Sequence, residues 1–422
     1  MPRVGWFAGD IIALRARRFE RNITQKKRTL RRNRSQEIGN LVNILFLLDH
    51  LGYAGGAWHG RTTYLVNVLP QLLATGHRVA VCALRDEHPV AERLRKAGVE
   101  VTCLDARRRS LRSLVGVAKL VERNNIDVIH AAQRESSTVA RALRVFMPAT
   151  GVVMHIVDSM PVPSIERCLN RLLPQPDVAL CVSSAVRSTA IHEYGVAERR
   201  VRVLHNAIDL AALKPSGPNT RERLRAEWNV PNDALVVAST SRFHSEKRLP
   251  VLIQMLPKIL VESPRTVVVF AGFGEEFERC RALSRTLGVD HAVRFLGHRN
   301  DIADILAASD VEVMLCLVEA FGFSAVEALA LGVPVVAYRA GGLPEIIVDG
   351  RTGLLADAQD DDGFRRNLVR LLQDTELRGR LSSGAREDAR RFGAPAHAAA
   401  LTQIYEQSLR ACRDLPSNYA FS

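Results

Sequence analysis

The sequence lacks the features that mark membrane-spanning and secreted proteins. No uninterrupted apolar run reaches the roughly 18 residues that a membrane-spanning helix needs, and no secretory signal is visible. The seven cysteines are scattered, without CxxC or metal-type spacing, and several lie in apolar runs. This usage is typical of buried thiols in a reducing compartment, so we expect a cytoplasmic protein.

Several catalytic signatures are also missing. The chain has no G-x-S-x-G string to support a serine hydrolase and no cluster of metal ligands. Gly272 and Gly274 follow an apolar run, but the third glycine of a dinucleotide-binding turn is absent. No repeat of solenoid period occurs. These absences argue against hydrolytic, metal-dependent and NAD-dependent chemistry.

Basic charge is concentrated in residues 1–40. The chain has a formal net charge of +13, and this segment holds eleven lysines and arginines against three acids, so +8 of the charge lies there. A short apolar group that includes Trp6 and Phe7 accompanies it. The alternatives are a solvated arm or a mis-assigned start, and an electrostatic anchor on the anionic inner face of the cell membrane. No nucleic-acid signature accompanies the charge, so we expect no nucleic-acid partner.

The length and the patterning predict two domains of α/β class. At 422 residues the chain exceeds one typical core, and 47% hydrophobic residues suffice to fill two. Strand-like apolar runs alternate with helical segments, which predicts doubly wound parallel sheets. The runs lie at 42–48, 77–84, 99–105, 126–131, 151–157, 178–183 and 201–206, and then at 236–242, 266–272, 292–298, 311–317 and 334–338.

The domain boundaries follow from the break in this alternation. A stretch with proline and glycine at 207–232 reads as an interdomain linker. We therefore expect a basic tail, a first domain, a second domain, and a C-terminal helix with a tail that returns to the first domain. Their ranges are 1–40, 41–210, 211–395 and 396–422.

The stretch from Glu319 to Leu355 is the most informative part of the sequence. The apolar run before it reads as a buried strand that ends near Glu319, at the carboxyl edge where open α/β sheets bind ligands. A helix is expected from Ser324 to Leu331, followed by a strand to Tyr338 and a short helix. The glycine pair 341–342 lies where backbone can approach a ligand closely.

The two acids of this stretch, Glu319 and Glu327, each allow a purely structural interpretation. Ser324-x-x-Glu327 has the form of a capping box, in which Glu327 would bond the backbone at the start of the helix. Glu319 would then be a solvated loop carboxylate. Spacing alone leaves the structural and functional interpretations equally open.

The wider string resembles the signature of retaining, nucleotide-sugar-dependent glycosyltransferases of family 4, which have the GT-B fold. That signature is E-x-F-G-x-x-x-x-E-A-x-A-x-G-x-P-V-V. The resemblance implies two Rossmann-like domains that face a central cleft, and transfer of a hexose-type sugar from a nucleoside-diphosphate sugar to a hydroxyl acceptor with retention. The positions that match are Glu319, Phe321, Gly322, Glu327, Ala328, Ala330, Gly332, Pro334, Val335 and Val336.

The resemblance also implies roles in the second domain. SRFHSEKR resembles the family's G-R-x-x-x-x-K-G element, so Arg242 and Lys247 would hold the diphosphate, although Ser241 and Arg248 replace glycines. Glu319 would contact sugar hydroxyls and act with these cations in catalysis. The remaining donor-binding residues would be Glu327 at the ribose, the backbone of Phe321, Gly322, Phe323 and Ser324 at the phosphates, and Phe295 and Leu296 at the base.

In the first domain the resemblance implies contacts to phosphate and acceptor. Gly55 and Gly56 lie in the first βα loop, where the family contacts donor phosphate and acceptor. His155 would reach the transferred sugar or the acceptor. His130 matches the first His of a family D-x-x-H-x-H string, but the second is Ala132. Asn206 matches the Asn of a family turn, and a structural turn residue is the alternative.

The resemblance implies that no metal cofactor is needed, because cations and backbone dipoles stabilise the leaving diphosphate in GT-B enzymes. The acceptor would be a glycan or a lipid-linked molecule of cell-envelope polysaccharide, lipopolysaccharide or glycolipid synthesis. The alternatives are a sugar-nucleotide epimerase or phosphorylase on the same fold, a non-catalytic nucleotide-sugar-binding scaffold, and a basic nucleic-acid-binding protein. The scaffold does not explain why both acids and both cations are present.

Overall fold

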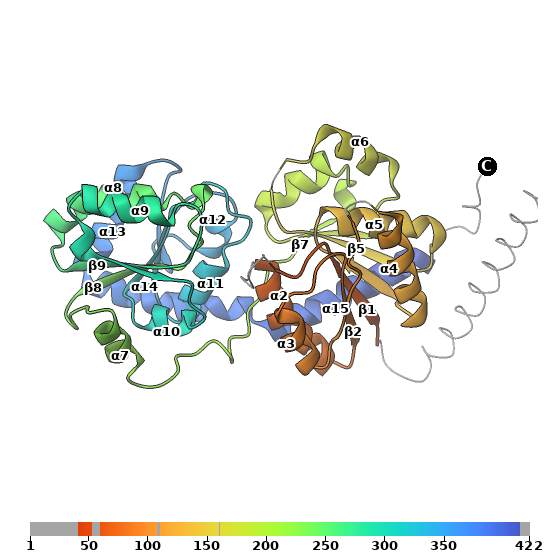
Figure 1. Cartoon of the computed structure of the whole chain (residues 1–422), viewed down its shortest axis with the longest axis horizontal. Helices are drawn as coiled ribbons and strands as arrows, with labels where there is room; N and C mark the ends of the chain where they lie inside the picture. The colour runs from red at the N-terminus through yellow and green to blue at the C-terminus, as the bar shows by residue number, and fades with distance from the viewer. Residues whose placement is uncertain (1–40, 53–59, 108–109, 160, 414–422) are drawn as a thin grey trace, which may run out of the picture.

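The chain forms two parallel sheets covered by helices (Figure 1). The computed structural model describes residues 41–52, 60–107, 110–159 and 161–413. The basic tail, Gly55 and Gly56 lie outside the described residues. Within them, the predicted pair of doubly wound parallel domains is confirmed. None of the helices in these ranges combines the length and the apolar character needed to cross a lipid bilayer.

The first sheet has its strands in the order β3-β2-β1-β4-β5-β6-β7. Its central strand β1 is buried on both faces, because Ile44 and Phe46 pack into one core while Leu45 and Leu47 pack into the other. This explains why the strand reads as a continuous apolar run. The strands are β1 Asn43–Leu48, β2 Arg78–Ala83, β3 Glu100–Cys103, β4 Val128–Ala131, β5 Gly151–Ile156, β6 Val178–Cys181 and β7 Val201–Val203, and the helices are α2 Gly60–Ala74, α3 Val90–Lys96, α4 Leu111–Arg123, α5 Arg134–Phe146 and α6 Ser164–Leu172.

The second sheet has the order β10-β9-β8-β11-β12-β13. Strand β13 was not expected, because its four residues form too short an apolar run to stand out in the sequence. The strands are β8 Leu235–Ser239, β9 Thr266–Ala271, β10 Val293–Gly297, β11 Val311–Met314, β12 Val335–Tyr338 and β13 Gly353–Ala356. The helices are α7 Thr220–Glu227, α8 Leu249–Glu262, α9 Phe277–Thr286, α10 Ile302–Ala307, α11 Phe323–Ala330, α12 Leu343–Ile346, α13 Asp361–Gln373 and α14 Thr375–Asp388.

The expected linker is shorter than the sequence suggested. Helix α7 lies inside the 207–232 stretch and packs Leu224 and Trp228 against the second sheet. These two apolar positions, four residues apart, stand among charged residues, so the stretch resembles a polar connection. The second domain therefore begins with α7.

Strand β11 ends at Met314 and not near Glu319, as its apolar run suggested. Val311 and Glu312 pair with β8, and the pairing with β12 ends at Met314. Leu315 and Cys316 are buried but continue as a loop, so apolar character here reflects burial without strand pairing. Glu319 consequently lies on a loop beyond the carboxyl end of the strand.

The C-terminal helix α15, Ala394–Arg413, packs against the first domain. Figure 1 shows it in blue among the orange elements of the first sheet. Ala398, Leu401 and Tyr405 are part of the same core as β1 and α2. The Tyr405 hydroxyl lies 2.8 Å from His130 Nδ1 on β4. The chain thus crosses from the second domain back to the first.

Candidate functional site

An ion pair joins the two sequence motifs of the second domain. Lys247 ends a short 3₁₀ turn after β8, and Glu319 follows β11, the neighbouring strand. Lys247 Nζ lies 2.7 Å from Glu319 Oε2, and the two side chains are only 16% and 17% exposed. Burial opposes the charged ammonium, but the nearby carboxylate outweighs it and raises the pKa of Lys247. The structure therefore holds a charged lysine beside an acid at the edge of the sheet.

Glycines 341 and 342 allow the Glu319 loop to fold tightly. The Gly342 amide donates to the Glu319 carbonyl at 2.7 Å. A Cβ added at Gly341 would lie 2.1 Å from that carbonyl oxygen, and Gly341 has a φ of +55°. The close approach that the sequence predicted at these glycines is therefore to the backbone of the 319–320 loop.

The start of α11 contradicts the capping-box interpretation. The N-cap residue is Gly322, with φ of 103° and no side-chain cap. Ser324 lies inside the helix, and its hydroxyl donates to Met314 Sδ at 3.7 Å. Glu327 is therefore not needed to cap the helix. Among the described residues no side chain caps the start of α11, which fits an anion at this end.

A second buried acid, Glu312 on β11, interacts with Glu327. Burial raises the pKa of Glu327 to about 7, and burial with the neighbouring Glu327 raises the pKa of Glu312 to about 8, although Thr240 opposes this. Glu312 Oε1 accepts from Thr240 N at 2.9 Å and from its hydroxyl at 2.7 Å. Glu312 Oε2 is buried and has no partner among the described residues. Sequence reasoning missed Glu312, because it stands inside an apolar strand pattern.

We expect Glu312 to make the protein less stable as the pH rises from 6.5 to 8. The folded protein holds a proton on Glu312 that the unfolded chain, with a pKa near 4.5, has released. Each such group lowers the free energy of unfolding by about 1.4 kcal/mol per pH unit between the two pKa values. The loss from Glu312 across this window is therefore about 2 kcal/mol. Urea unfolding at several pH values measures it.

The Glu312→Gln variant is the control for this pH dependence. Glutamine keeps an oxygen for the bonds from Thr240 but cannot ionise. Between pH 6.5 and 8 the free energy of unfolding of this variant should therefore rise by about 2 kcal/mol relative to that of the parent protein. The same slope in both proteins would mean that Glu312 does not carry a raised pKa.

Arg242 does not share the contact between Lys247 and Glu319. Its side chain is 44% exposed and lies 3.3 Å from Glu246. Arg248, where the family signature has glycine, adopts a left-handed φ of 51°. This conformation explains the usual glycine, and the guanidinium of Arg248 instead lies over the Tyr338 ring, 5.3 Å from its centroid.

Phe295 and Leu296 do not line one pocket. They are adjacent on β10, so their side chains point to opposite faces of the sheet. Phe295 stacks on Phe270 with ring centroids 5.4 Å apart and belongs to one core of the domain, while Leu296 packs with the other. The two side chains therefore do not form one pocket wall together, and contact of either residue with the base stays a prediction.

The two predicted histidines of the first domain form a buried contact. His130 Nε2 lies 3.0 Å from His155 Nδ1, and the two residues are 0% and 2% exposed. Burial lowers the pKa of His155 to about 3, with further lowering by His397 and Arg61. His155 Nε2 and Asn206 Oδ1 are buried without a partner in the described part of the chain. Of the first-domain residues that the sequence singled out, these two present an unpaired polar atom among the described residues.

Glu345 on α12 connects the two domains and was also missed by sequence reasoning. Its carboxylate accepts from the amides of Ser184 and Ala185 at 2.9 and 3.2 Å, and Oε2 lies 3.0 Å from His205 Nε2. Ser183 Oγ donates to the Ala320 carbonyl, 2.6 Å away, beside Glu319. The loop that carries Glu319 therefore contacts both domains.

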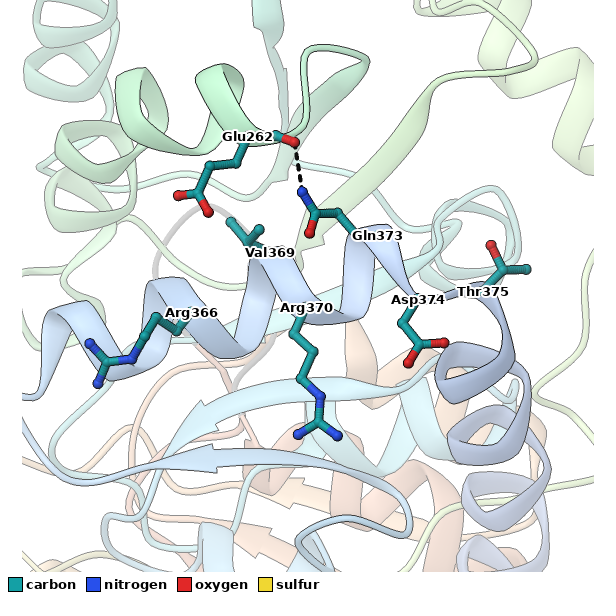
Figure 2. Close-up of a pocket in the computed structure, with 7 residues that line it drawn as sticks. All are labelled: Glu262, Arg366, Val369, Arg370, Gln373, Asp374 and Thr375. Atoms are coloured by element: carbon teal, nitrogen blue, oxygen red, sulfur yellow. Dashed lines mark hydrogen bonds between the residues drawn. The ribbon is translucent and has the colours of Figure 1, made fainter.

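The second domain also has a pocket that the predicted site residues do not line. Figure 2 shows a pocket lined by Glu262 of α8, residues of α13 and the start of α14, where Gln373 donates to the Glu262 carbonyl at 2.8 Å. It contains none of the predicted site residues. No three His, Cys, Asp or Glu side chains within the described ranges are grouped as metal ligands would be.

Two family models match the chain. The model described as Glycosyltransferase Family 4 matches residues 58–212, and the model described as Glycosyl transferases group 1 matches residues 220–388. The first match covers most of the first domain and the second covers the sheet that carries Lys247 and Glu319. Both domains of the chain therefore match models of glycosyltransferases.

Individual relatives agree with these matches. A D-inositol 3-phosphate glycosyltransferase of Corynebacterium efficiens is 33% identical over 252 residues, which are 58% of this chain and 59% of that protein. An N-acetyl-alpha-D-glucosaminyl L-malate synthase of Bacillus anthracis is 27% identical over 64% of this chain and 72% of that protein. The chain thus spans less than two thirds of the corynebacterial relative.

The fold is shared with a solved structure. Anabaena Alr3699/HepE in complex with UDP superposes with a TM-score of 0.73 at 23% identity, over 86% of this chain and 99% of that chain. The same Anabaena protein has been solved with UDP-glucose. At this identity the likeness concerns the arrangement of two facing Rossmann-like domains.

Proposed function

The chain belongs to the family 4 glycosyltransferases of the GT-B fold, and on that premise we propose that it transfers a hexose from a nucleoside-diphosphate sugar to a hydroxyl acceptor, with retention of anomeric configuration. The observation that carries this proposal is the contact between Lys247 and Glu319. It places a cation and an acid from motifs 72 residues apart at one point on the carboxyl edge of the second sheet.

The proposed chemistry is electrostatic. As the bond between sugar and diphosphate breaks, negative charge grows on the leaving group, and the ammonium of Lys247 with the amides at the start of α11 would stabilise it. Arg242, whose side chain is 44% exposed, would turn toward the diphosphate when the donor binds. Glu319 would then exchange its ion pair for hydroxyls of the sugar. The attacking hydroxyl would approach from the face of the leaving group.

Glu327 would bind the ribose of the donor. A carboxyl with a pKa of about 7 is partly protonated at neutral pH, so it can both donate to and accept from a diol. His155 Nε2 and Asn206 Oδ1 would serve the sugar or the acceptor from the first domain. This division assigns the donor mainly to the second domain and the acceptor to the first.

The Anabaena protein's complexes with UDP and UDP-glucose make a uridine donor the first to test. We propose that no metal ion is needed, since Lys247, Arg242 and backbone amides supply the positive potential. The acceptor would be a glycan or a lipid-linked molecule of envelope biosynthesis, met at the cytoplasmic face of the membrane.

A thermal-shift screen tests the donor. We expect UDP or UDP-sugars, at 100 times the dissociation constant and with EDTA present, to stabilise the protein by about 2.7 kcal/mol. GDP, ADP and CMP are the comparison set. If no nucleotide raises the melting temperature, the transferase proposal fails at its first step. If one does so only with a divalent cation, the proposed metal independence is wrong.

A further inference from the structure

Helix α6 exposes its apolar side to solvent. Ile165, Leu169 and Leu172 are 74%, 50% and 82% exposed. They stand at positions i, i+4 and i+7 and therefore form one stripe along the helix. The polar Asn170, by contrast, is 4% exposed and faces the protein. This orientation is the reverse of that of an ordinary surface helix.

The body of the first domain fixes α6 in this orientation. The guanidinium of Arg141, fully buried on α5, donates to the carbonyls of Asn170, Leu173 and Pro174 at the end of α6, the last at 2.8 Å. Before the helix, the Val162 amide donates to the Glu193 carboxylate at 2.8 Å. Both ends are therefore held, and the exposed stripe is a stable property of the fold.

The stripe is too small to hold a protein partner by itself. A helix of nine residues is about 14 Å long and about 10 Å wide, which gives a face of roughly 140 Å². A stable protein interface buries about 800 Å² on each partner. A lipid surface sets no such minimum, because three immersed side chains add to attraction between charges.

The charge around α6 favours an anionic surface. The 198–200 turn lies beside the segment that follows α6, where Arg200 donates to the Pro176 carbonyl at 2.9 Å. Ion pairs of 3.4 and 2.8 Å, Arg167–Glu193 and Arg187–Glu198, neutralise part of the charge. Helix α6 and this turn together hold four arginines (167, 171, 199 and 200) against two glutamates (166 and 198), and the ion-pair partners Arg187 and Glu193 add one charge of each sign.

We propose that α6 docks on an anionic lipid bilayer through Ile165, Leu169 and Leu172. The helix follows β5, whose carboxyl end carries His155, after seven intervening residues. Docking there would bring the lipid surface beside the edge of the first sheet at which an acceptor enters. The placement of a lipid-borne acceptor rests on the proposed function, whereas the docking itself does not.

Cys168 gives a direct test, because it is the one exposed cysteine among the seven. It lies within the stripe, between Ile165 and Leu169. We expect an environment-sensitive fluorophore on Cys168 of the full chain to shift to shorter wavelength with vesicles of phosphatidylglycerol and phosphatidylcholine. The same probe on Leu111→Cys in a Cys168→Ser background, at a 73% exposed site on α4, should not shift. No shift at Cys168 on vesicles that sediment the protein would overturn the proposal.

Vesicle co-sedimentation measures the contribution of the stripe. Replacing Ile165, Leu169 and Leu172 with glutamine should weaken binding to these vesicles by about 100-fold. The matched control, Leu111→Gln with Val261→Gln, removes two equally exposed apolar side chains elsewhere and should bind as the parent does. Unchanged binding of the triple variant would refute docking through α6, as would a parent dimer that the triple variant converts to monomer.

The nucleotide thermal shift separates this proposal from the function. The triple variant should keep the full stabilisation by the nucleotide that the parent binds, because α6 lies outside the second domain. Vesicle binding with no nucleotide effect in the parent would support the docking surface and remove the transferase proposal. A nucleotide shift without vesicle binding in the parent would support the transferase proposal and refute the docking surface.

Discussion

Replacing Lys247 with alanine should abolish donor binding and reduce kcat/KM by roughly 1,000-fold, since loss of one preorganised group at a developing charge costs about 100- to 1,000-fold. Lys247 is 16% exposed, and burial strengthens its interaction with a phosphate. The substitution also leaves Glu319 without its cation, beside the site where a negatively charged diphosphate would bind. Both effects act in the same direction. Isothermal titration with the nucleotide and initial-rate kinetics measure them.

The control for this substitution is Lys258→Ala. Lys258 is an exposed lysine on α8, in the same domain, and no shift of fold or activity is expected from its loss. A far-UV spectrum and a melting curve establish that the Lys247→Ala protein is folded. If the folded variant binds the nucleotide as tightly as the Lys258→Ala protein, the diphosphate does not bind where we propose.

The sequence predicted the fold well because alternation is a local property. Strands buried on both faces read as apolar runs, and β1 and β5 were located to within a residue or two. The ends of elements were less predictable. Strand β11 ends at Met314, where its pairing with β12 ends, and the apolar residues 315–318 that follow do not mark this end in the sequence.

The site was predictable only where residues belong to a motif. Lys247 and Glu319 were found from their strings, and the structure brings them within 2.7 Å. Glu312 and Glu345 were missed because nothing near them in sequence distinguishes them. Glu312 depends on Thr240 from another strand, and Glu345 depends on amides of the other domain. Such residues are defined by long-range contacts.

The orientation of α6 could not be predicted from the sequence either. Its apolar spacing is that of any helix that packs on a core, and the pattern does not reveal which side faces the protein. The decisive contact is that of Arg141 with the end of the helix. An apolar stripe is therefore an interaction surface only once the rest of the fold has placed it.

Replacing Tyr405 with alanine should lower the free energy of unfolding by about 3 to 5 kcal/mol, the range for loss of a fully buried aromatic side chain. Tyr405 is 0% exposed, and its hydroxyl lies 2.8 Å from His130 Nδ1. The substitution opens a cavity between α15 and the first sheet and leaves His130 without this partner. Calorimetry should show the transition roughly 6 to 15 °C lower.

Two further variants separate packing from hydrogen bonding. Tyr405→Phe keeps the ring and should cost only about 1 kcal/mol, since it removes the hydroxyl bond to His130. Gln407→Ala, two residues further along α15 on its exposed side, should leave the melting temperature unchanged. Because α15 connects the second domain to the first, Tyr405→Ala should also lose activity below its melting temperature. If Tyr405→Ala has the same melting temperature as Gln407→Ala, the C-terminal helix does not hold the two domains together. Their arrangement would then depend on contacts such as those of Glu345.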